Sequence, residues 1–485
     1  MKITIDFTNS IKIVEAKKGS RLLNILLDNG AKIDTDCGGR GRCNKCKVKL
    51  VSGAVSGQEK NKDGYILSCL AYVEDEDIEV KVDSVLDEDL VNHEKTLTGN
   101  FGIAFDLGTT TLAFSLVNTD TKEVVDTYSV LNKQSVFGAD VISRISAANE
   151  GHLDKLQEII LNQVRDSIRF FKKKYNIDKI DSVVVAGNTT MLHLFLGVSP
   201  ESIGVSPYKP QFVDYKVVKG KDLNVDCNTL QLLPSFSGYV GADITAGVYA
   251  LDLQDDEILV DLGTNGEIIY KTHGDYYATS TAAGPCLEGA CFDCGIGGVD
   301  GAISKFEIND DGSVDYKTIN DYKPTGICGA GLVDIMANLL RLDIVDETGA
   351  LNLENDKYQI TDDIFLSAKD VREFQLAKSA ICSGIKVLLK DTGMDINSIK
   401  KFYIAGGIGY HINLENAIYT GILPCEAEKK VYVAGNSSLI GAIKCLTEEG
   451  AAKKMEEIAS TCEIIELNNS ASFGDEYVNN MFFTK

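Results

Sequence analysis

The segment FGIAFDLGTTTLAFSLV (residues 101–117) is echoed by ILVDLGTNGEIIY (residues 258–270), and this repeat decides the fold. Each segment has an apolar run, the tetrapeptide Asp-Leu-Gly-Thr and a second apolar run, which predicts a β-hairpin that turns at the tetrapeptide. Glycine lets the backbone approach a phosphate, threonine and backbone N–H groups bind phosphate oxygens, and aspartate holds Mg²⁺ directly or through water. One copy could be an ordinary hairpin, but the pair predicts a phosphate clamp.

A second pair of segments extends the repeat. VVVAGNTTM (183–191) is echoed by VYVAGNSSL (431–439), so that hairpins and Gly-Asn motifs alternate along the chain. This order predicts a duplicated fold whose halves face each other across a cleft. A further glycine turn, Ala405–Gly409, follows an apolar run, which by itself is a weak signal.

The order of these segments resembles that of the actin and sugar-kinase ATPase superfamily, with its phosphate-1, connect-1, phosphate-2, adenosine and connect-2 motifs. The resemblance implies that Asp106 and Asp261 organise Mg²⁺ and the attacking water. It also implies the residues that bind ATP, which are Gly108, Thr109, Thr110, Gly263, Thr264, Asn265, Gly406, Gly407 and Gly409.

Composition limits the classes of function. The chain has 485 residues, enough for roughly three domains of about 150 residues. A net charge of −23 argues against nucleic acid as a partner, because a phosphate backbone needs a basic surface. There is no signal peptide and no apolar run long enough to span a membrane. Together with 13 cysteines, this predicts a reducing cytoplasmic location with metal-bound or free thiols.

The N-terminal region carries a cysteine motif. Cys37, Cys43 and Cys46 form C-x5-C-x2-C in a glycine-rich segment, and Cys69 follows later. This spacing is typical of a [2Fe–2S] ferredoxin loop, where glycines permit the tight bend around the cluster. The alternative is a zinc knuckle, but zinc usually requires two paired C-x2-C motifs.

The segments around these cysteines predict a β-grasp ferredoxin. MKITIDF and IKIVEAKK form a hairpin, RLLNILLDNG a helix, and IEVKV at 78–82 a returning strand. The predicted fold class is therefore α+β and α/β, with a β-grasp [2Fe–2S] domain followed by a duplicated, ribonuclease H-like ATPase. The predicted boundaries are 1–85 for the ferredoxin, 86–100 for an acidic linker, and 101–245 and 246–485 for the two ATPase halves.

The combination resembles the reductive activators of corrinoid proteins and corrinoid-dependent methyltransferases. The motifs that carry this resemblance are CGGRGRCNKC, FGADVISRI (137–145), LPSFSGYVGADITAG (233–247), VDLGTNGEI, AAGPCLEGA (282–290), TGICGAGLVD (325–334), DVREFQLAKSAI (370–381) and FYIAGGIGYHINLENAIYTGILP (402–424). The resemblance implies ATP-dependent reduction of Co(II) to Co(I) through the [2Fe–2S] cluster. It also implies a corrinoid partner, a low-potential electron donor and a homodimer.

The chain departs from longer members of that family in two ways. The segment 83–100 leaves no room for an extra domain between ferredoxin and ATPase, so a short form without a middle domain is expected. Cys286, Cys291 and Cys294 also form C-x4-C-x2-C, with Cys328 as a fourth thiol. This spacing could hold a second iron–sulfur cluster, or the residues could be buried or free thiols.

Several single residues remain ambiguous from sequence. Asp140 and Asp243 could be catalytic or could cap helices. His193 and His411 are expected to be structural, although His193 could contact a corrinoid partner. Lys378 could reach the nucleotide or could be a solvated helix lysine.

Two other functions stay open at this point. The cysteine-rich segment would suit an activator of another low-potential metalloenzyme, of the 2-hydroxyacyl-CoA dehydratase or double-cubane type. The chain could also be an ATPase or kinase that an iron–sulfur cluster regulates, although no motif indicates a sugar or carboxylate substrate.

Overall fold

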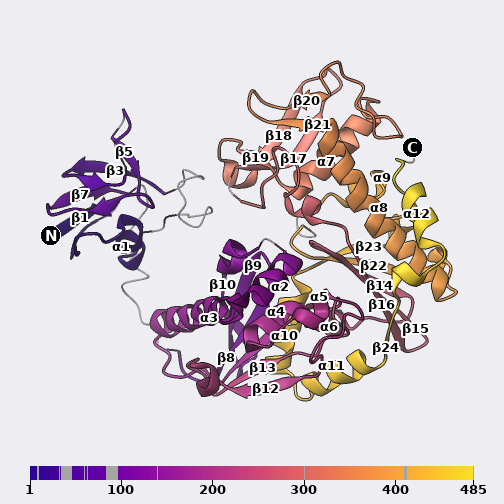
Figure 1. Ribbon diagram of the computed structural model, residues 1–485, viewed down its shortest axis with the longest axis horizontal. Coiled ribbons are helices and arrows are strands. Elements are labelled where there is room, and N and C mark those ends of the chain that lie inside the picture. Colours follow the sequence, from indigo (N-terminus) through magenta and orange to yellow (C-terminus); the bar gives the residue numbers. More distant parts are fainter. Residues whose placement is uncertain are drawn as a thin grey trace. The chain divides into compact units, whose positions relative to one another are not determined.

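The computed structural model describes residues 1–483 except for 8–9, 32, 34–45, 59, 63, 83–96, 139, 300 and 409–411. The chain divides into two compact units (Figure 1). They are Met1–Thr98 with Arg169–Asp178, and Gly99–Ile168 with Lys179–Lys485. The predicted linker at 86–100 lies outside the described residues as far as position 96. None of the described helices combines the length and apolar character that crossing a bilayer requires.

The N-terminal unit contains a five-stranded sheet in the order β2-β1-β7-β3-β5. Strand β1 pairs antiparallel with β2 and parallel with β7, as the predicted hairpin and returning strand require. Ile3 and Ile5 alternate with more exposed residues along β1 and pack against Leu22 and Leu26 of the predicted helix. The elements are β1 (Lys2–Asp6), β2 (Ile11–Glu15), α1 (Leu22–Asp28), β3 (Lys47–Ser52), β4 (Val55–Ser56), β5 (Tyr65–Leu67), β6 (Tyr72–Val73) and β7 (Ile78–Lys81).

The larger unit contains two six-stranded sheets, in the orders β10-β9-β8-β11-β13-β12 and β23-β22-β14-β15-β16-β24. In both, a three-stranded antiparallel meander is extended on its first strand by parallel strands, which confirms the predicted duplication. The strands are β8 (Phe101–Leu107), β9 (Thr111–Asn118), β10 (Glu123–Leu131), β11 (Ser182–Gly187), β12 (Lys216–Lys219), β13 (Thr229–Leu232), β14 (Glu257–Leu262), β15 (Gly266–Thr272), β16 (Asp275–Thr281), β22 (Lys401–Ala405), β23 (Val431–Gly435) and β24 (Cys462–Ile464).

Burial follows strand position. In β8 every residue except Asp106 is buried, as expected of a central strand covered on both faces. The edge strand β10 has no fully buried residue. Asp106 and Asp261 lie near the carboxyl ends of β8 and β14, so the central strands carry both acids to corresponding edges of their sheets.

Two helices exchange partners between the halves. Helix α6 (Ala242–Leu251) follows the first sheet in sequence but packs Ile244 and Val248 with residues of the second sheet. Helix α10 (Ser437–Thr447) follows β23 but lies against the first sheet, where a Cβ on Gly102 would be 2.7 Å from Leu446. The two helices run side by side (Figure 1) and approach closely, since a Cβ on Gly441 would lie 2.2 Å from the carbonyl oxygen of Ala246.

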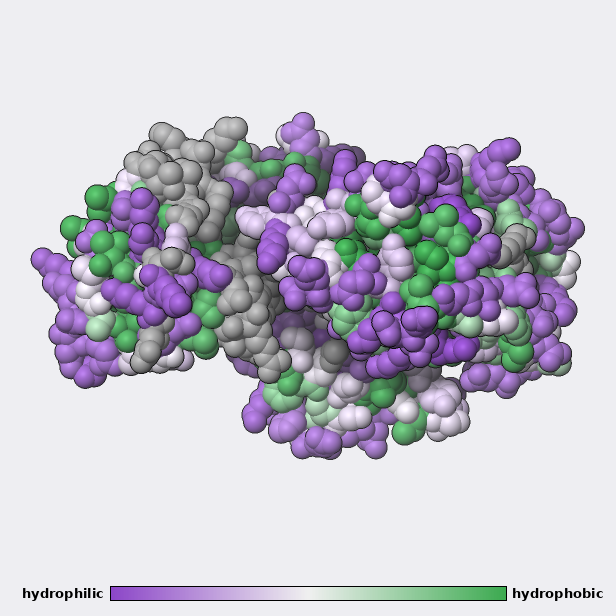
Figure 2. Space-filling model, turned by 90° about the horizontal axis from the view of Figure 1, so that it is seen from above, coloured by the Kyte–Doolittle hydropathy of each residue, from purple (hydrophilic) through white to green (hydrophobic). Residues whose placement is uncertain are grey.

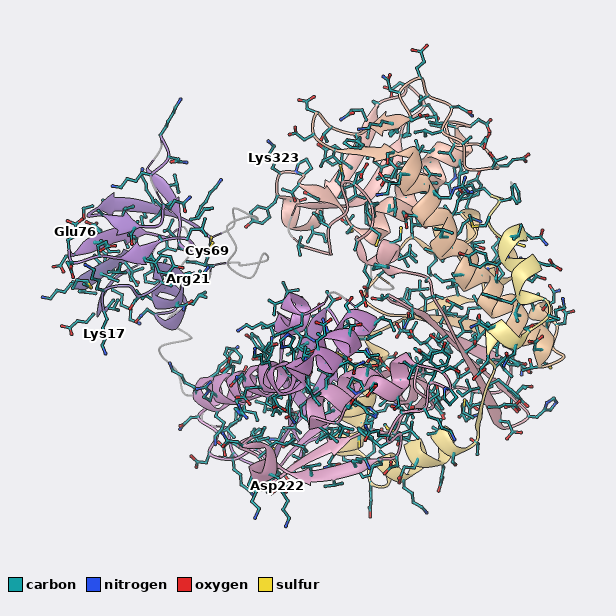
Figure 3. The ribbon with its side chains drawn as sticks, viewed as in Figure 1. Lys17, Arg21, Cys69, Glu76, Asp222 and Lys323 are labelled. Atoms are coloured by element: carbon teal, nitrogen blue, oxygen red, sulfur yellow. The ribbon has the colours of Figure 1, made fainter. Side chains whose placement is uncertain are left out.

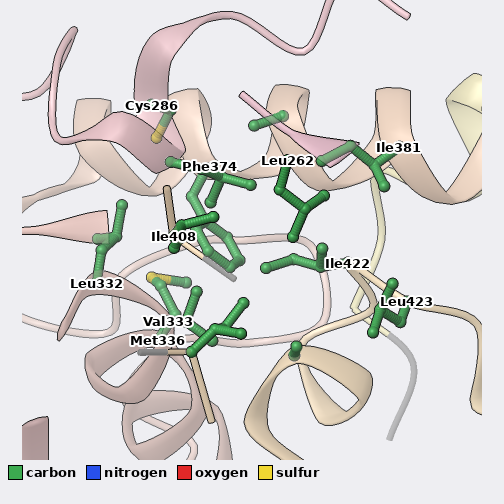
Figure 4. Packing of buried hydrophobic residues seen from close by; sticks show 14 of the residues in the cluster. Leu262, Cys286, Leu332, Val333, Met336, Phe374, Ile381, Ile408, Ile422 and Leu423 are labelled. Carbon is green, nitrogen blue, oxygen red and sulfur yellow. The ribbon is translucent and has the colours of Figure 1, made fainter. Parts of the chain in front are cut away.

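The second half also carries an insertion between β16 and β22. A three-stranded sheet and helices α7 and α8 enclose a hydrophobic core with β14, in which Leu262, Phe374 and Ile408 meet (Figure 4). Hydrophilic residues cover most of the face in Figure 2. The inserted elements are β17 (Ala302–Ile308), β18 (Val314–Thr318), β19 (Gly326–Ile327), α7 (Gly329–Arg341), β20 (Lys357–Gln359), β21 (Phe365–Ser367) and α8 (Ala368–Asp391).

The predicted boundary between positions 245 and 246 falls inside α6, so the first half extends to the end of that helix. The remaining helices are α2 (Val141–Ala147), α3 (Leu153–Tyr175), α4 (Thr189–Leu196), α5 (Glu201–Gly204), α9 (Leu414–Tyr419), α11 (Ala451–Ser460) and α12 (Phe473–Asn479).

Candidate active site

The backbone carbonyls of the first hairpin turn accept hydrogen bonds from two other segments of the first half. Asn132 donates from its side chain to Gly108 O at 2.9 Å and from its backbone N–H to Thr110 O at 2.8 Å. Between these contacts, Arg144 Nη2 donates to Thr109 O at 2.6 Å. Because the C=O and N–H groups of a peptide point in opposite directions, the N–H groups that follow these carbonyls are directed away from Asn132 and Arg144.

Those N–H groups are available to a ligand. Within the described part of the chain, no hydrogen-bond acceptor meets the backbone N–H of Thr109 or Thr110. Asn188 of the first Gly-Asn motif donates from Nδ2 to Thr109 Oγ1 at 3.1 Å, which orients that hydroxyl. Successive free N–H groups in a turn can bind an anion, so the predicted phosphate site stays a prediction that these groups could serve.

Asp106, at the end of β8, is satisfied by the start of α10. Its Oδ2 accepts from Asn436 Nδ2 at 2.9 Å and its Oδ1 from Ser438 Oγ at 2.8 Å. Burial raises the pKa of Asp106, and these two hydrogen bonds oppose the rise. The second Gly-Asn motif thus contacts the first hairpin, although it lies more than three hundred residues away in sequence.

The second hairpin has a different environment. Asp261 pairs in register with Glu267 across the hairpin, and Thr264 Oγ1 donates to Glu288 Oε2 at 2.7 Å. No hydrogen-bond donor among the described residues meets the carboxylate of Asp261. Three acids therefore gather at this turn, and only Asp261 was predicted.

The carboxylates at the two turns raise one another's pKa values. Desolvation, followed by the charge of Asp106, raises the pKa of Asp243 to about 7. Desolvation and then the charges of Asp243, Asp106 and Glu288 raise the pKa of Asp261 to about 8. Burial also raises the pKa values of Glu267 and Glu288. A cluster of this kind calls for a cation.

Mg²⁺ fits this donor set. No group of three or more described Asp, Glu, His or Cys side chains is arranged to hold a metal ion unaided. Mg²⁺ is commonly bound through one or two carboxylates, with water and substrate phosphates completing its shell, so incomplete ligation by protein is what a Mg²⁺–nucleotide site requires. The candidates to serve it are the predicted Asp106 and Asp261, together with Asp243, whose charges act on one another here.

Glu267 and Glu288 were missed from the sequence, although both lay in quoted motifs. Glu267 follows the second tetrapeptide in VDLGTNGEI, and counting the hairpin register would have placed it opposite Asp261. Glu288 lies in AAGPCLEGA, a motif of the family resemblance in which only Cys286 was predicted to have a role.

The predicted adenosine turn adjoins the second hairpin. Gly406 has φ of +91°, and a Cβ there would lie 2.5 Å from Leu262 O and 2.7 Å from Asp261 Oδ1. Only glycine fits this position without displacing backbone. A Cβ on Gly407 would meet open space, whereas Gly409 lies outside the described residues.

The two aspartates that were ambiguous from sequence can now be placed. Asp140 caps α2 by accepting from Ser143 N at 2.8 Å, so its capping role is the one observed. Asp243 lies in the first turn of α6 and faces the acidic cluster instead. Both Gly-Asn motifs cap helices, with Asn188 at α4 and Asn436 at α10.

His193 is structural, as expected. It is fully buried, lies 4.2 Å from the stacked ring of Phe212, and contacts Thr189 O through Nδ1 at 2.7 Å. The backbone N–H of Gln211 donates to Nε2 at 3.1 Å, so Nδ1 carries the proton. Such a residue offers no surface to a corrinoid partner. His411 lies outside the described residues.

Lys378 neither reaches the predicted nucleotide residues nor lies in solvent. Its side chain is buried on α8, and Nζ donates to Asn480 O at 2.6 Å and Phe482 O at 2.8 Å. Burial lowers its pKa to about 8. Lys378 therefore anchors the C-terminal segment to α8.

In the N-terminal unit, the two described cysteines of the predicted cluster lie together. Cys46 and Cys69 are buried in one small group with Leu23 and Leu67. Arg21 Nε donates to Cys69 O at 2.6 Å, which holds the loop that carries this cysteine (Figure 3). Cys37 and Cys43 lie outside the described residues. Two neighbouring buried cysteines on a β-grasp scaffold fit the [2Fe–2S] prediction.

The four cysteines of the second predicted cluster do not form a site. Cys286 points into the hydrophobic core beside Phe374 and Ile408 (Figure 4). Cys328 is also buried and donates from Sγ to Ile303 O at 3.3 Å. All four are described, and they are not arranged to hold a metal ion. The spacing was misleading because the core takes two of the thiols, while Cys291 is exposed.

Three family models match successive parts of the chain. The 2Fe-2S iron-sulfur cluster binding domain matches residues 7–74, the RACo middle region matches 101–256, and the C-terminal domain of RACo, the ASKHA domain, matches 255–485. The middle-region match coincides with the first half of the duplicated fold and adds no domain between the ferredoxin and the ATPase. The junction at 255–256 lies between α6 and β14.

Individual relatives agree with these matches. The chain is 34% identical to the corrinoid activation enzyme RamQ of Eubacterium limosum, over 79% of this chain and 70% of RamQ. It is 24% identical to the [Co(II) methylated amine-specific corrinoid protein] reductase of Methanosarcina barkeri, over 78% of this chain and 76% of that one. The structure of a reductive activator for corrinoid, iron-sulfur protein superposes with a TM-score of 0.72 at 27% identity, covering 99% of this chain and 98% of that one. The chain therefore belongs to the family of reductive activators of corrinoid proteins.

Proposed function

We propose that this chain uses ATP hydrolysis to drive one-electron reduction of a corrinoid protein, from Co(II) to Co(I), with electrons entering through the N-terminal [2Fe–2S] domain. The observation that carries the proposal is that one chain joins this domain to a duplicated ATPase fold, along the length shared with the corrinoid activation enzyme RamQ. A low-potential electron donor and assembly as a homodimer belong to the same proposal.

The described residues divide the work of ATP hydrolysis. The N–H groups of Thr109 and Thr110 bind phosphate oxygens, and Asn188 orients the Thr109 hydroxyl toward the same ligand. Bound Mg²⁺ neutralises charge that develops on the transferred phosphoryl group. Asp261 and Asp243 hold their carboxylates where that ion is needed, while Glu288, fixed by Thr264, is placed to orient the attacking water.

ATP is needed because the electron moves energetically uphill. A bound [2Fe–2S] cluster of this type carries one electron at about −400 mV. Each 59 mV by which the acceptor lies lower costs a factor of about ten in the equilibrium. Nucleotide binding can shift that equilibrium only if the ATP and ADP states of the activator differ in affinity for the oxidised partner.

Helices α6 and α10 supply a structural basis for such states. They join the two halves, and their N-terminal ends carry Asp243 and Ser438 to the acids of the hairpins. A change of charge at the hairpins therefore acts on the helices that connect the halves.

The test is anaerobic reduction of a corrinoid protein loaded with Co(II). The cluster-loaded chain, titanium(III) citrate as reductant and MgATP should abolish the Co(II) EPR signal and produce the Co(I) absorbance, whereas MgADP should not. Asp261→Ala should keep the cluster absorbance but lose the reaction, and Cys69→Ser should lose the cluster but retain ATP hydrolysis. Equal reduction with and without ATP would refute the proposal.

The alternative functions now have less support. An activator of the dehydratase or double-cubane type depended on a second cluster at Cys286, Cys291, Cys294 and Cys328, which the structure does not assemble. No described feature favours a small-molecule kinase over the proposed reductase.

A further inference from the structure

Arg144 is a buried cation whose hydrogen-bond acceptors are uncharged. It lies on α2, its exposed fraction is 0%, and no described carboxylate forms an ion pair with it. Besides Thr109 O, it donates to Gly138 O at 3.1 Å, Gln134 Oε1 at 3.1 Å and Met191 Sδ at 3.2 Å. A buried charge without a counter-ion is costly and usually signals a partner that is absent from the free protein.

Asp140 acts on Arg144 as a neighbouring charge, which raises the pKa of Arg144, but it forms no ion pair with the guanidinium. Asp140 lies on the same helix, but its Oδ1 accepts from Ser143 N and its Oδ2 from Ser143 Oγ, both at 2.8 Å. Burial lowers the pKa of Arg144 to about 10, so the guanidinium is still charged at neutral pH. The positive charge of Arg144 therefore acts electrostatically on any ligand that binds at the first hairpin turn.

The geometry points to phosphate as the missing partner. Arg144 donates a hydrogen bond to the carbonyl oxygen of Thr109. The backbone N–H groups of Thr109 and Thr110 have no acceptor among the described residues. The guanidinium thus polarises and fixes the peptide units that present these donors. An anion at the turn would meet both the oriented N–H groups and the positive field behind them.

We propose that Arg144 is a positioning residue for the nucleotide phosphates, which acts through the Gly108–Thr110 turn without touching the ligand. The proposal rests on the proposed function only in that ATP is the ligand of this turn. The guanidinium makes affinity depend on phosphate charge, so that its loss weakens ATP more than ADP and leaves adenosine unaffected. A residue that merely supports the fold would weaken all three alike.

The experiment measures binding of MgATP, MgADP and adenosine to the full-length, cluster-loaded chain by calorimetry. Arg144→Lys and Arg144→Gln are compared with Arg165→Gln. Arg165 lies in the same half and also holds backbone carbonyls, those of Asn224 and Leu223, but it pairs with Glu158. We expect at least tenfold weaker MgATP binding in both Arg144 variants, a smaller loss for MgADP, and adenosine affinity within twofold of wild type. Arg165→Gln should bind all three normally.

Asn132→Ala provides a second variant should the Arg144 variants fail to fold. It removes the side-chain contact to Gly108 O without disturbing a buried charge, and the same graded loss of phosphate affinity is expected. Unchanged MgATP affinity in folded variants, or equal losses for MgATP and adenosine, would overturn the role of Arg144. Failure of the wild-type chain to bind MgATP would instead refute the proposed function.

Discussion

The two hairpins share the tetrapeptide Asp-Leu-Gly-Thr, but hydrogen-bond donors surround the aspartate of one and acids surround the aspartate of the other. Asp106 of the first hairpin lies opposite Ala113 and accepts two hydrogen bonds from the start of α10. Asp261 of the second lies opposite Glu267 and shares its surroundings with further acids. The second hairpin is also one residue shorter, since it closes at Leu262–Gly266 where the first closes at Leu107–Leu112.

The difference indicates a division of roles. The first hairpin is held rigid by donors, which leaves its own N–H groups free for phosphate. The second gathers negative charge that a cation must balance. The proposed function therefore assigns phosphate to the first turn and Mg²⁺ to the second, because the surrounding elements bring donors to one turn and carboxylates to the other.

The largest expected effects come from replacing Asp106 or Asp261, and the two variants should differ in stability. Asp106→Ala and Asp261→Ala should each lower ATP hydrolysis by about 100-fold or more. Asp106→Ala leaves Asn436 and Ser438 without their acceptor, so it should cost about 1–3 kcal/mol of unfolding free energy. Asp261→Ala removes a carboxylate that the native state holds at a raised pKa, so it should stabilise the Mg²⁺-free protein.

Calorimetric melting in Mg²⁺-free buffer measures both changes, and the absorbance of the [2Fe–2S] cluster checks that the N-terminal domain is intact. Equal stability changes in the two variants would show that the hairpins have equivalent environments, contrary to the comparison.

Removal of metal tests the second hairpin directly. Mg²⁺ at one hundred times its dissociation constant should stabilise the wild-type protein by about 2.7 kcal/mol, measured as a rise in melting temperature that EDTA reverses. Asp261→Ala should abolish this rise, because the proposed function assigns this carboxylate to the ion. Asp311→Asn, on an exposed loop, should keep it. A full Mg²⁺ response in Asp261→Ala would place the metal elsewhere.

The two Gly-Asn motifs allow a matched test of the same asymmetry. Asn188→Ala and Asn436→Ala each remove a helix cap, so both should lose about 1 kcal/mol of stability in chemical denaturation. Steady-state ATPase kinetics should separate them. Asn188 contacts Thr109, and its loss should raise the KM for ATP, whereas Asn436 contacts Asp106, and its loss should lower kcat. Each change is expected to be about tenfold, or 1.4 kcal/mol. Identical kinetics would argue against separate roles.

The smallest effect on ATP binding is expected at Lys378, a buried cation of the second half, where only the pH dependence of stability should change. Its pKa of about 8 is below the ordinary value of 10.5, so between these pH values the native state binds fewer protons than the unfolded state. The free energy of unfolding should therefore rise as pH increases from about 8 to 10.5, by at most about 1.4 kcal/mol per pH unit. Lys378→Met should remove that slope in denaturation curves and leave ATP affinity unchanged. Loss of ATP binding would instead link Lys378 to the nucleotide site.

Much of the fold could be predicted because its signals are local. Apolar runs around a glycine turn predict hairpins, and the predicted β-grasp segments became β1, β2, α1 and β7. Local spacing failed where the core decided the outcome. Cys286 and Cys328 have cluster-like spacing but pack as apolar residues, and the boundary at 245 fell inside a helix because α6 connects the two halves.

The sequence by itself determined the duplication, the two glycine turns and the ferredoxin segments, since each is written within a short stretch of chain. Only the tertiary structure decided that Asp106 of the first copy is hydrogen-bonded and that Asp261 of the second copy lies among other acids. The donors to Asp106 come from Asn436 and Ser438, and the guanidinium behind Thr109 comes from a separate helix. Charges and hydrogen bonds act between residues that are distant in sequence, so two identical tetrapeptides do not by themselves show which donors or acids will surround them.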